Sequence, residues 1–158
     1  IIDRKALNSV VYTNVKYVIA VVGIVYGSVN FNAGAESNQT AKFEWQYYNS
    51  KSEIERSIQN ANGKPTMIDF TADWCAACKE LDKYTYTNSR VIELSMKFNN
   101  IKVDLTKENK EISDKYKILG LPVVAFIDKY GNEISNLRVT GFVEPEEFSN
   151  VMEKALSN

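Results

Sequence analysis

The sequence predicts an α/β domain in which a central mixed sheet carries helices on both faces, preceded by an N-terminal hydrophobic helix. Three observations indicate this class. Short apolar runs typical of buried strands alternate with amphipathic segments along residues 43–158, in the order βαβαβαββα. The chain has 158 residues, 44% of them hydrophobic, which suits one domain with an appendage. Residues 17–35 carry no charged side chain.

The uncharged stretch at residues 17–35 contains the apolar run YVIAVVGIVYGSV. A helix of about 20 residues spans about 30 Å of hydrocarbon, so this segment is long enough to cross a membrane. Arg4, Lys5 and Lys16 precede it, and no further Lys or Arg occurs before Lys42. The positive-inside rule then places the amino end in the cytoplasm and the rest of the chain outside.

Two other interpretations of this segment stay open, namely a signal peptide and a buried helix of a soluble domain. Ala33-Gly34-Ala35 has the small-x-small form of a signal-peptide cleavage site. We expect residues 1–35 to hold a cytoplasmic end and a transmembrane helix, or a signal peptide. Residues 36–42 are then a linker, and residues 43–158 form the folded domain.

The first part of the domain contains a strand, a helix and a second strand. KFEWQYY, at residues 42–48, alternates as a short strand does. Ser50-Lys51-Ser52-Glu53 forms a capping box that opens a helix, which Gly63 and Pro65 end. The apolar stripe of this helix is Ile54, Ile58 and Ala61. TMIDF, at residues 66–70, is typical of a buried strand.

The remainder alternates helices and strands up to a final helix. A helix begins near Cys75, and an apolar pattern predicts a second helical stretch through Val91, Leu94, Met96 and Phe98. Strands are predicted at residues 101–105, 123–127 and 138–140, and a short helix at residues 112–116. Proline and acids in Glu144-Pro145-Glu146-Glu147 open the last helix. Its apolar side is Phe148, Val151, Met152, Ala155 and Leu156.

The composition excludes several kinds of function. The chain has no histidine, which removes Ser/His and Cys/His catalysis, histidine metal sites and histidine pH switches. The formal net charge of -1 predicts no nucleic-acid partner. Two cysteines cannot form a disulfide framework. No cofactor is expected, because two sulfur atoms suffice to carry electrons in dithiol chemistry.

The two cysteines form the motif Trp74-Cys75-Ala76-Ala77-Cys78 between a predicted strand and a predicted helix. A helix amino terminus favours the thiolate of Cys75, and Cys78 lies one turn later on the same side. Cys75 can therefore attack a partner disulfide, and Cys78 can resolve the mixed disulfide. A zinc site would need two more ligands, and a purely structural bridge across so short a loop would stabilise little.

The motifs MIDFTADWCAACKELDKYTYTNSRV, ILGLPVVAFID and RVTGFVEPEEF resemble the thioredoxin superfamily. Within it, the chain is most similar to the C-terminal periplasmic domain of the DsbD family of thiol:disulfide interchange proteins. The resemblance implies a thioredoxin-like fold and a protein-disulfide reductase at the bacterial inner membrane, with its domain in the periplasm. In that family a membrane domain passes electrons from cytoplasmic thioredoxin to this domain, which reduces an N-terminal periplasmic domain that supplies isomerases and cytochrome c maturation.

The resemblance also implies roles for particular residues. Cys75 would attack and Cys78 would resolve, while Trp74 would flank the exposed sulfur. Pro122 matches the cis-proline whose loop faces the dithiol and pairs with the partner backbone. Leu121 precedes it, where many thioredoxins carry Ile or Thr, so partner choice is expected to differ. From the residues alone, Pro122 is also compatible with an ordinary proline at the start of a strand.

Two carboxylates complete the expected site. Asp69 lies in an apolar strand six residues before Cys75, either as a solvated or capped strand end or, as the resemblance implies, as a buried acid that exchanges protons with Cys78. Asp82 follows Cys78 by four residues and either approaches the dithiol or pairs on the surface with Lys79 or Lys83.

The nearby acids predict a reducing dithiol. Carboxylates and desolvation raise a thiol pKa, so we expect the Cys75 pKa to lie near or above the free value of about 8.5. Three alternatives stay open at this point. They are a released thioredoxin-like oxidoreductase, a non-catalytic thioredoxin-fold binding module, and an oxidase or isomerase with a different potential.

Overall fold

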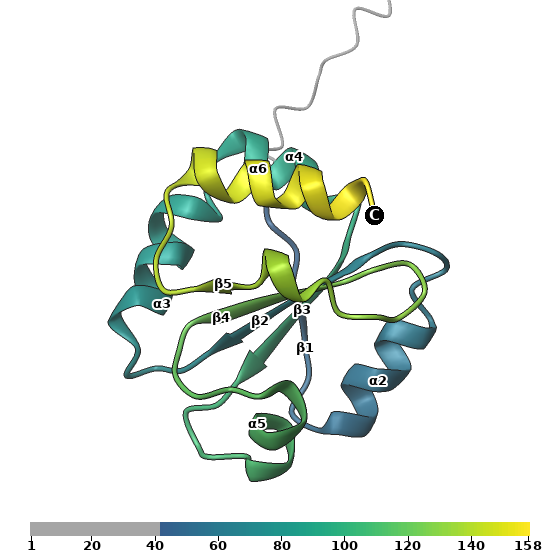
Figure 1. Cartoon of the computed structure of the whole chain (residues 1–158). Coiled ribbons are helices and arrows are strands. Elements are labelled where there is room, and N and C mark those ends of the chain that lie inside the picture. Colours follow the sequence, from purple (N-terminus) through teal and green to yellow (C-terminus); the bar gives the residue numbers. More distant parts are fainter. Residues whose placement is uncertain (1–41) are drawn as a thin grey trace, which may run out of the picture. The chain divides into compact units, whose positions relative to one another are not determined.

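A computed structural model describes residues 42–158 and places five strands in one mixed sheet (Figure 1). The strands are β1 (Gln46–Tyr47), β2 (Thr66–Thr71), β3 (Asn99–Asp104), β4 (Val123–Ile127) and β5 (Val139–Thr140). Their order across the sheet is β1-β3-β2-β4-β5. Strands β1, β3 and β2 run parallel, whereas β4 is antiparallel to both β2 and β5. The predicted mixed sheet is confirmed.

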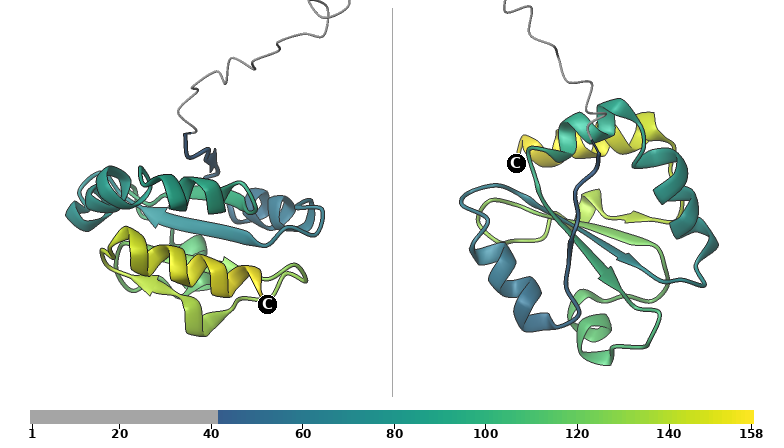
Figure 2. Two further views of the ribbon diagram at one scale, coloured as in Figure 1. Left: turned by 90° about the horizontal axis from the view of Figure 1, so that it is seen from above. Right: turned by 180° about the vertical axis from the view of Figure 1, so that it is seen from behind.

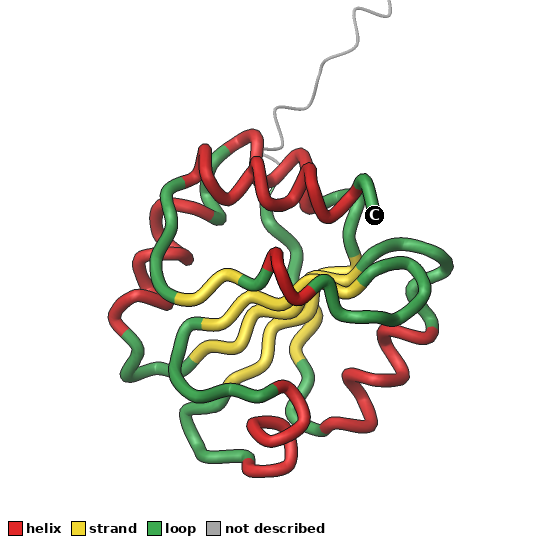
Figure 3. Tube along the Cα trace, in the orientation of Figure 1, coloured by secondary structure: helices red, strands yellow, loops and turns green. Residues whose placement is uncertain are grey.

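Helices cover both faces of this sheet, as predicted. One face carries α2 (Lys51–Gln59) and α5 (Lys110–Tyr116), and the other carries α3 (Ala76–Glu80), α4 (Ser89–Ser95) and α6 (Pro145–Leu156) (Figures 1 and 3). A π-helical turn, η1 (Leu81–Thr85), continues α3, and a 3-10 turn, η2 (Ser135–Leu137), precedes β5. Figure 2 shows α4 and α6 side by side over the sheet from above and again from behind.

Side-chain caps fix where the helices begin. In α2 the Glu53 N–H donates to Ser50 Oγ at 3.3 Å and the Ser50 N–H donates to Glu53 Oε2 at 3.2 Å, which is the predicted capping box. Asn88 caps α4 and Asn109 caps α5, each with a side-chain oxygen that accepts from backbone N–H groups of the first turn. Helix α6 begins with Pro145, whose missing N–H costs nothing in a first turn.

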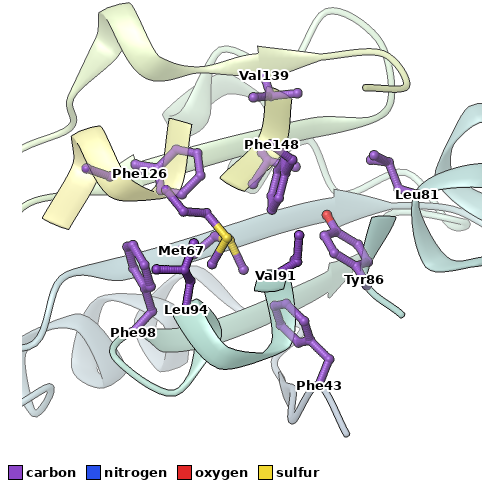
Figure 4. Packing of buried hydrophobic residues seen from close by; sticks show 13 residues of the cluster. Phe43, Met67, Leu81, Tyr86, Val91, Leu94, Phe98, Phe126, Val139 and Phe148 are labelled. Atoms are coloured by element: carbon purple, nitrogen blue, oxygen red, sulfur yellow. The ribbon is translucent and has the colours of Figure 1, made fainter. Parts of the chain in front are cut away.

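The alternation of side chains along β2 divides the core into two clusters. Ile68 and Phe70 face α2 and α5, where they pack with Ile54 and Ile112. Met67 faces the other helices, where Figure 4 shows it among the side chains of a second cluster. That cluster is formed mainly by Phe43, Leu81, Tyr86, Val91, Leu94, Phe98, Phe126 and Phe148. Asp69, two residues after Met67, therefore faces the same side as α3 and η1.

Several element boundaries differ from the sequence prediction, most clearly those of α4, β3 and β1. Helix α4 ends at Ser95, and Met96, expected on its apolar stripe, is exposed. Strand β3 begins at Asn99 and ends at Asp104, because its pairing with β2 starts at the partners Thr66 and Asn99. Strand β1 keeps only Gln46–Tyr47 of the predicted run, since only these residues pair with β3.

The predicted anchor or signal segment at residues 1–35 and nearly all of the linker at 36–42 lie outside the described residues. Among residues 42–158, every helix falls short of the length and apolar character that a membrane crossing requires. The domain boundaries stay predictions.

Candidate redox site at Cys75 and Cys78

The two cysteines lie where β2 gives way to α3 and are joined by a disulfide. The S–S distance is 2.03 Å and the Cα atoms are 5.3 Å apart. Cys75 is the N-cap of α3, and the Cys78 N–H donates to Cys75 Sγ at 3.2 Å. The Cys75 N–H donates to the Ala72 carbonyl at 3.0 Å, which fixes the turn that leaves the strand. An N–H directed at Cys75 Sγ stabilises negative charge on that sulfur after reduction.

The loop that ends at Pro122 lies against the disulfide. The Leu121–Pro122 peptide bond is cis, as the resemblance implies. The side chain of Leu121 packs on Ala72, Cys75 and Cys78, which together form a small apolar cluster. The Gly141 N–H donates to the Pro122 carbonyl at 3.2 Å and so ties this loop to the segment after β5.

Cys75 is less accessible than the resemblance implies. Only 4% of the residue is exposed, because its sulfur is bonded to Cys78 and is covered by Ala72 and Leu121. Trp74 is 66% exposed, as a residue flanking the site should be. It shares with Leu121 the lining of a groove of about 460 Å³. A second groove, of about 540 Å³, is lined by Leu121, Pro122 and Gly141. Leu121 lines both grooves and packs on the disulfide, so a partner segment bound in either groove would lie against the loop that covers Cys75 and Cys78.

A buried group of charges lies between β2, β3 and η1. Asp69 is 2% exposed, so it is not a solvated strand end. Its Oδ2 lies 3.0 Å from the Nζ of Lys102, its register partner on β3. The same Nζ contacts Oδ1 of Asp82, whose side chain is half exposed. Asp82 thus pairs with the buried Lys102 and not with Lys79 or Lys83. Two carboxylates and one ammonium give this cluster a formal charge of -1.

Burial and charge act on this cluster in opposite directions. Burial raises the pKa of Asp69 to about 6, although Lys102 pulls it down. Burial alone would lower the pKa of Lys102, but attraction to Asp69 and Asp82 outweighs it and leaves the pKa above its ordinary value. At neutral pH the cluster therefore holds a charged lysine and a mostly ionised Asp69 that can still accept a proton.

Aromatic rings enclose the lysine of this cluster. Lys102 Nζ lies 4.9 Å from the centroid of the Trp45 ring and 5.2 Å from that of the Tyr86 ring. Trp45 stacks on Phe43 with centroids 4.3 Å apart. A desolvated cation over aromatic faces gains electrostatic stabilisation, so the rings hold Lys102 in its place between the carboxylates.

Sequence reasoning missed Lys102 and Tyr86. The available signal for Lys102 was a lysine between the apolar residues Ile101 and Val103 of a predicted strand, because a buried lysine needs a partner. Nothing in the sequence pattern sets the hydroxyl of Tyr86 apart from the neighbouring tyrosines. Within residues 42–158, no three side chains of the metal-binding types Cys, His, Asp and Glu lie together.

The chain is similar to known thioredoxin-like proteins over most of the described region. A family model of the thioredoxin-like domain matches residues 53–156. The thiol:disulfide interchange protein DsbD of Yersinia pestis is 36% identical over 121 residues, which is 75% of this chain and 20% of that protein. DsbD of Actinobacillus pleuropneumoniae is 35% identical over 130 residues, 80% of this chain and 22% of that protein. The chain thus spans about a fifth of the length of these relatives.

Solved structures show the same fold. The oxidised C-terminal domain of DsbD from Neisseria meningitidis superposes with a TM-score of 0.60 and 24% identity, covering 70% of this chain and 99% of that one. A thioredoxin from Malassezia sympodialis gives a TM-score of 0.61 with 22% identity, covering 76% of this chain and 97% of that one. At these identities the superpositions establish the thioredoxin-like fold.

Proposed function

Because this chain belongs to the thioredoxin-like domain family, we propose that it is a thiol:disulfide oxidoreductase of the DsbD C-terminal type that reduces disulfides in partner proteins. One observation carries the proposal. A disulfide between Cys75 and Cys78 caps the start of α3 and lies against the loop of Leu121 and Pro122, which lines two grooves. The 36% identity to the DsbD of Yersinia pestis supports the same function.

The reaction starts from the reduced pair. The Cys75 thiolate attacks one sulfur of a partner disulfide, whose S–S bond breaks, and the second partner sulfur leaves as a thiolate and takes a proton. Cys78 then gives its proton to a base and attacks the Cys75 sulfur. The mixed disulfide breaks, and the partner's other sulfur leaves as a thiolate and takes a proton. The partner has gained two electrons from the pair and two protons, one that left Cys78 and one from water, and the Cys75–Cys78 disulfide has formed. A dithiol donor must reduce this disulfide before the next cycle.

Asp69 is the base that we assign to the resolving step. It is buried and ionised at neutral pH, with a pKa of about 6 that permits it to take and return a proton. Asp82 joins the cluster from the solvent side through Lys102. Its half-exposed carboxylate gives the buried charges a connection to water.

The balance of charge favours a reductant over an oxidant. Strong oxidants of this fold stabilise the thiolate of the reduced form. Here Ala76 and Ala77 provide no charge between the cysteines, and the cluster of Asp69, Asp82 and Lys102 sums to -1. Negative charge near a thiol raises its pKa, so the reduced form is less stabilised and gives up its electrons more readily.

We further propose that the domain works outside the cytoplasm, tethered to a bacterial inner membrane by residues 1–35. The uncharged stretch at residues 17–35 and the lysines and arginine before it support this placement. The similarity to DsbD proteins supports partners of the same kind, namely periplasmic redox proteins, an N-terminal DsbD-type domain as acceptor and a membrane electron-transfer domain as donor. Delivery of electrons toward cytochrome c maturation belongs to the same proposal.

Replacing the resolving cysteine tests the function. In Cys78→Ala the attack by Cys75 still occurs, but the mixed disulfide cannot be resolved, so covalent complexes with partner proteins should accumulate and disappear on reduction. Cys75→Ala is the matched control and should trap few or none. If neither variant yields complexes in cells that make the full chain, the protein is a binding module whose cysteines only join the start of α3.

A further inference from the structure

Two buried polar atoms near the Lys102 ammonium lack regular hydrogen-bond partners in the described part of the chain. Tyr86 is 3% exposed, and within residues 42–158 its hydroxyl has no partner at the distance and angle of a regular hydrogen bond. Oδ1 of Asp69, the carboxylate oxygen that Lys102 does not contact, is also buried without a hydrogen-bond partner among these residues. A buried polar atom without a partner is costly and therefore rare in folded proteins. Two of them around one charge cluster point to an interaction between them.

Tyr86 and Asp69 face the same cation. Lys102 Nζ lies 5.2 Å from the centroid of the Tyr86 ring and 3.0 Å from Asp69 Oδ2. Tyr86 is held in place on both sides by ring contacts, at 5.1 Å to Phe43 and 5.5 Å to Phe148 (Figure 4). The π-helical hydrogen bond from the Tyr86 N–H to the Leu81 carbonyl, 2.9 Å, fixes its backbone where η1 ends. The hydroxyl therefore has a rigid support beside the cluster.

We propose that Tyr86 is a positioning residue for the proton acceptor of the dithiol, with its hydroxyl donating a hydrogen bond to Oδ1 of ionised Asp69. This inference rests on the proposed function and adds to it the group that keeps Asp69 ionised and oriented. Lys102 then holds one carboxylate oxygen and Tyr86 holds the other. Asp69 receives the proton that leaves Cys78, and Tyr86 keeps its own proton throughout.

The direction of the mutual effects agrees with this arrangement. Burial, followed by the negative charges of Asp69 and Asp82, raises the pKa of Tyr86 well above its ordinary value, so the phenol stays a donor. A hydrogen bond to a carboxylate favours its charged form and lowers its pKa. The other charged groups that act on Asp69 are Lys102 from β3 and Asp82 from η1, and reduction adds two thiols, at Cys75 before α3 and at Cys78 within it.

Tyr86→Phe removes the hydroxyl and keeps the ring, and Tyr116→Phe is a matched control. Tyr116 is also buried with an unpartnered hydroxyl, but it packs on Phe70 on the opposite face of the sheet. The carbonyl stretch of protonated Asp69, followed by infrared spectroscopy of the oxidised full chain against pH, reports its titration without any partner protein. Asp69→Asn identifies that band.

In Tyr86→Phe the acid dissociation constant of Asp69 should fall about tenfold, because one hydrogen bond to a charged group is lost. In Tyr116→Phe it should not change. An unchanged constant in Tyr86→Phe, or equal shifts in both variants, would overturn the proposal. If Tyr86→Phe does not fold, an NMR measurement on the unsubstituted chain still tests the hydrogen bond. The proposal requires a slowly exchanging Tyr86 hydroxyl proton in its NMR spectrum that titrates with Asp69, and its absence would contradict the hydrogen bond.

These measurements stand apart from the test of the function. Cys78→Ala could fail to trap partners while Tyr86→Phe still lowers the acid dissociation constant of Asp69 about tenfold. That result would support the hydrogen bond and refute only its role in the dithiol reaction. Trapped partners with no effect of Tyr86→Phe would leave the redox function in place and refute the role of Tyr86.

Discussion

Burial of Asp69 lowers the stability of the fold and at the same time gives this residue the pKa of a proton acceptor. Asp69 is 2% exposed, and the Lys102 ammonium that it contacts also contacts Asp82. Burial therefore raises the pKa of Asp69 to about 6 from the usual 3.8, although Lys102 opposes the shift. The folded chain binds this proton more tightly than the unfolded chain. Its stability consequently falls as the pH rises through the interval between these two values.

Asp69→Asn should remove this loss of folding stability at higher pH. The amide resembles the protonated acid in shape and charge, so near pH 8 the variant should unfold with a free energy about 1–3 kcal/mol above that of the parent chain. Near pH 4, where Asp69 itself is mostly protonated, the difference should vanish. Urea unfolding of the full chain at both pH values measures this. Asp114→Asn, in an exposed carboxylate of α5, is the control and should change stability at neither pH. A variant less stable than its parent near pH 8 would show that the ionised carboxylate stabilises the fold.

At the scale of elements, the site is a junction of three segments. Strand β2 brings Asp69 beside Lys102, helix α3 begins at Cys75, and the loop between α5 and β4 carries Leu121 onto the disulfide. This loop starts at Lys117, the residue after α5. Lys117 has a left-handed conformation with φ of 52°, which ends the helix and turns the chain toward β4. The loop therefore controls access to the sulfur atoms, while the strands and η1 set their electrostatic surroundings.

Leu121→Ala tests whether the loop covers the disulfide. The leucine side chain packs on Cys75 and Cys78, so its removal should expose Sγ and raise the rate of reduction by dithiothreitol by at least about threefold. Leu119→Ala is the matched control, because Leu119 is fully exposed and lies outside that cluster. Stopped-flow measurement of the second-order rate constant gives both values. Equal rates in the two variants would mean that Leu121 does not limit access.

At the scale of the whole molecule, the sequence predicts the features that depend on local pattern. The periodicity of apolar residues, the capping box at Ser50 and Glu53, and the cysteines at a helix start give the order of elements and the chemical centre. The partner of Asp82 could not be predicted, because Lys102 reaches it only through the pairing of β2 with β3. The low exposure of Cys75 likewise results from a loop 46 residues away, which no local pattern reports.

The central claim is that this dithiol gives electrons to its partners. Its most direct test is the reduction potential of the Cys75–Cys78 pair in the full chain, obtained by equilibration against glutathione buffers at neutral pH. The cluster of charge -1 formed by Asp69, Asp82 and Lys102, with no cation between the two cysteines, predicts a potential below about -180 mV, among the reductants of this fold. A potential near about -120 mV, the range of a strong oxidant, would contradict it.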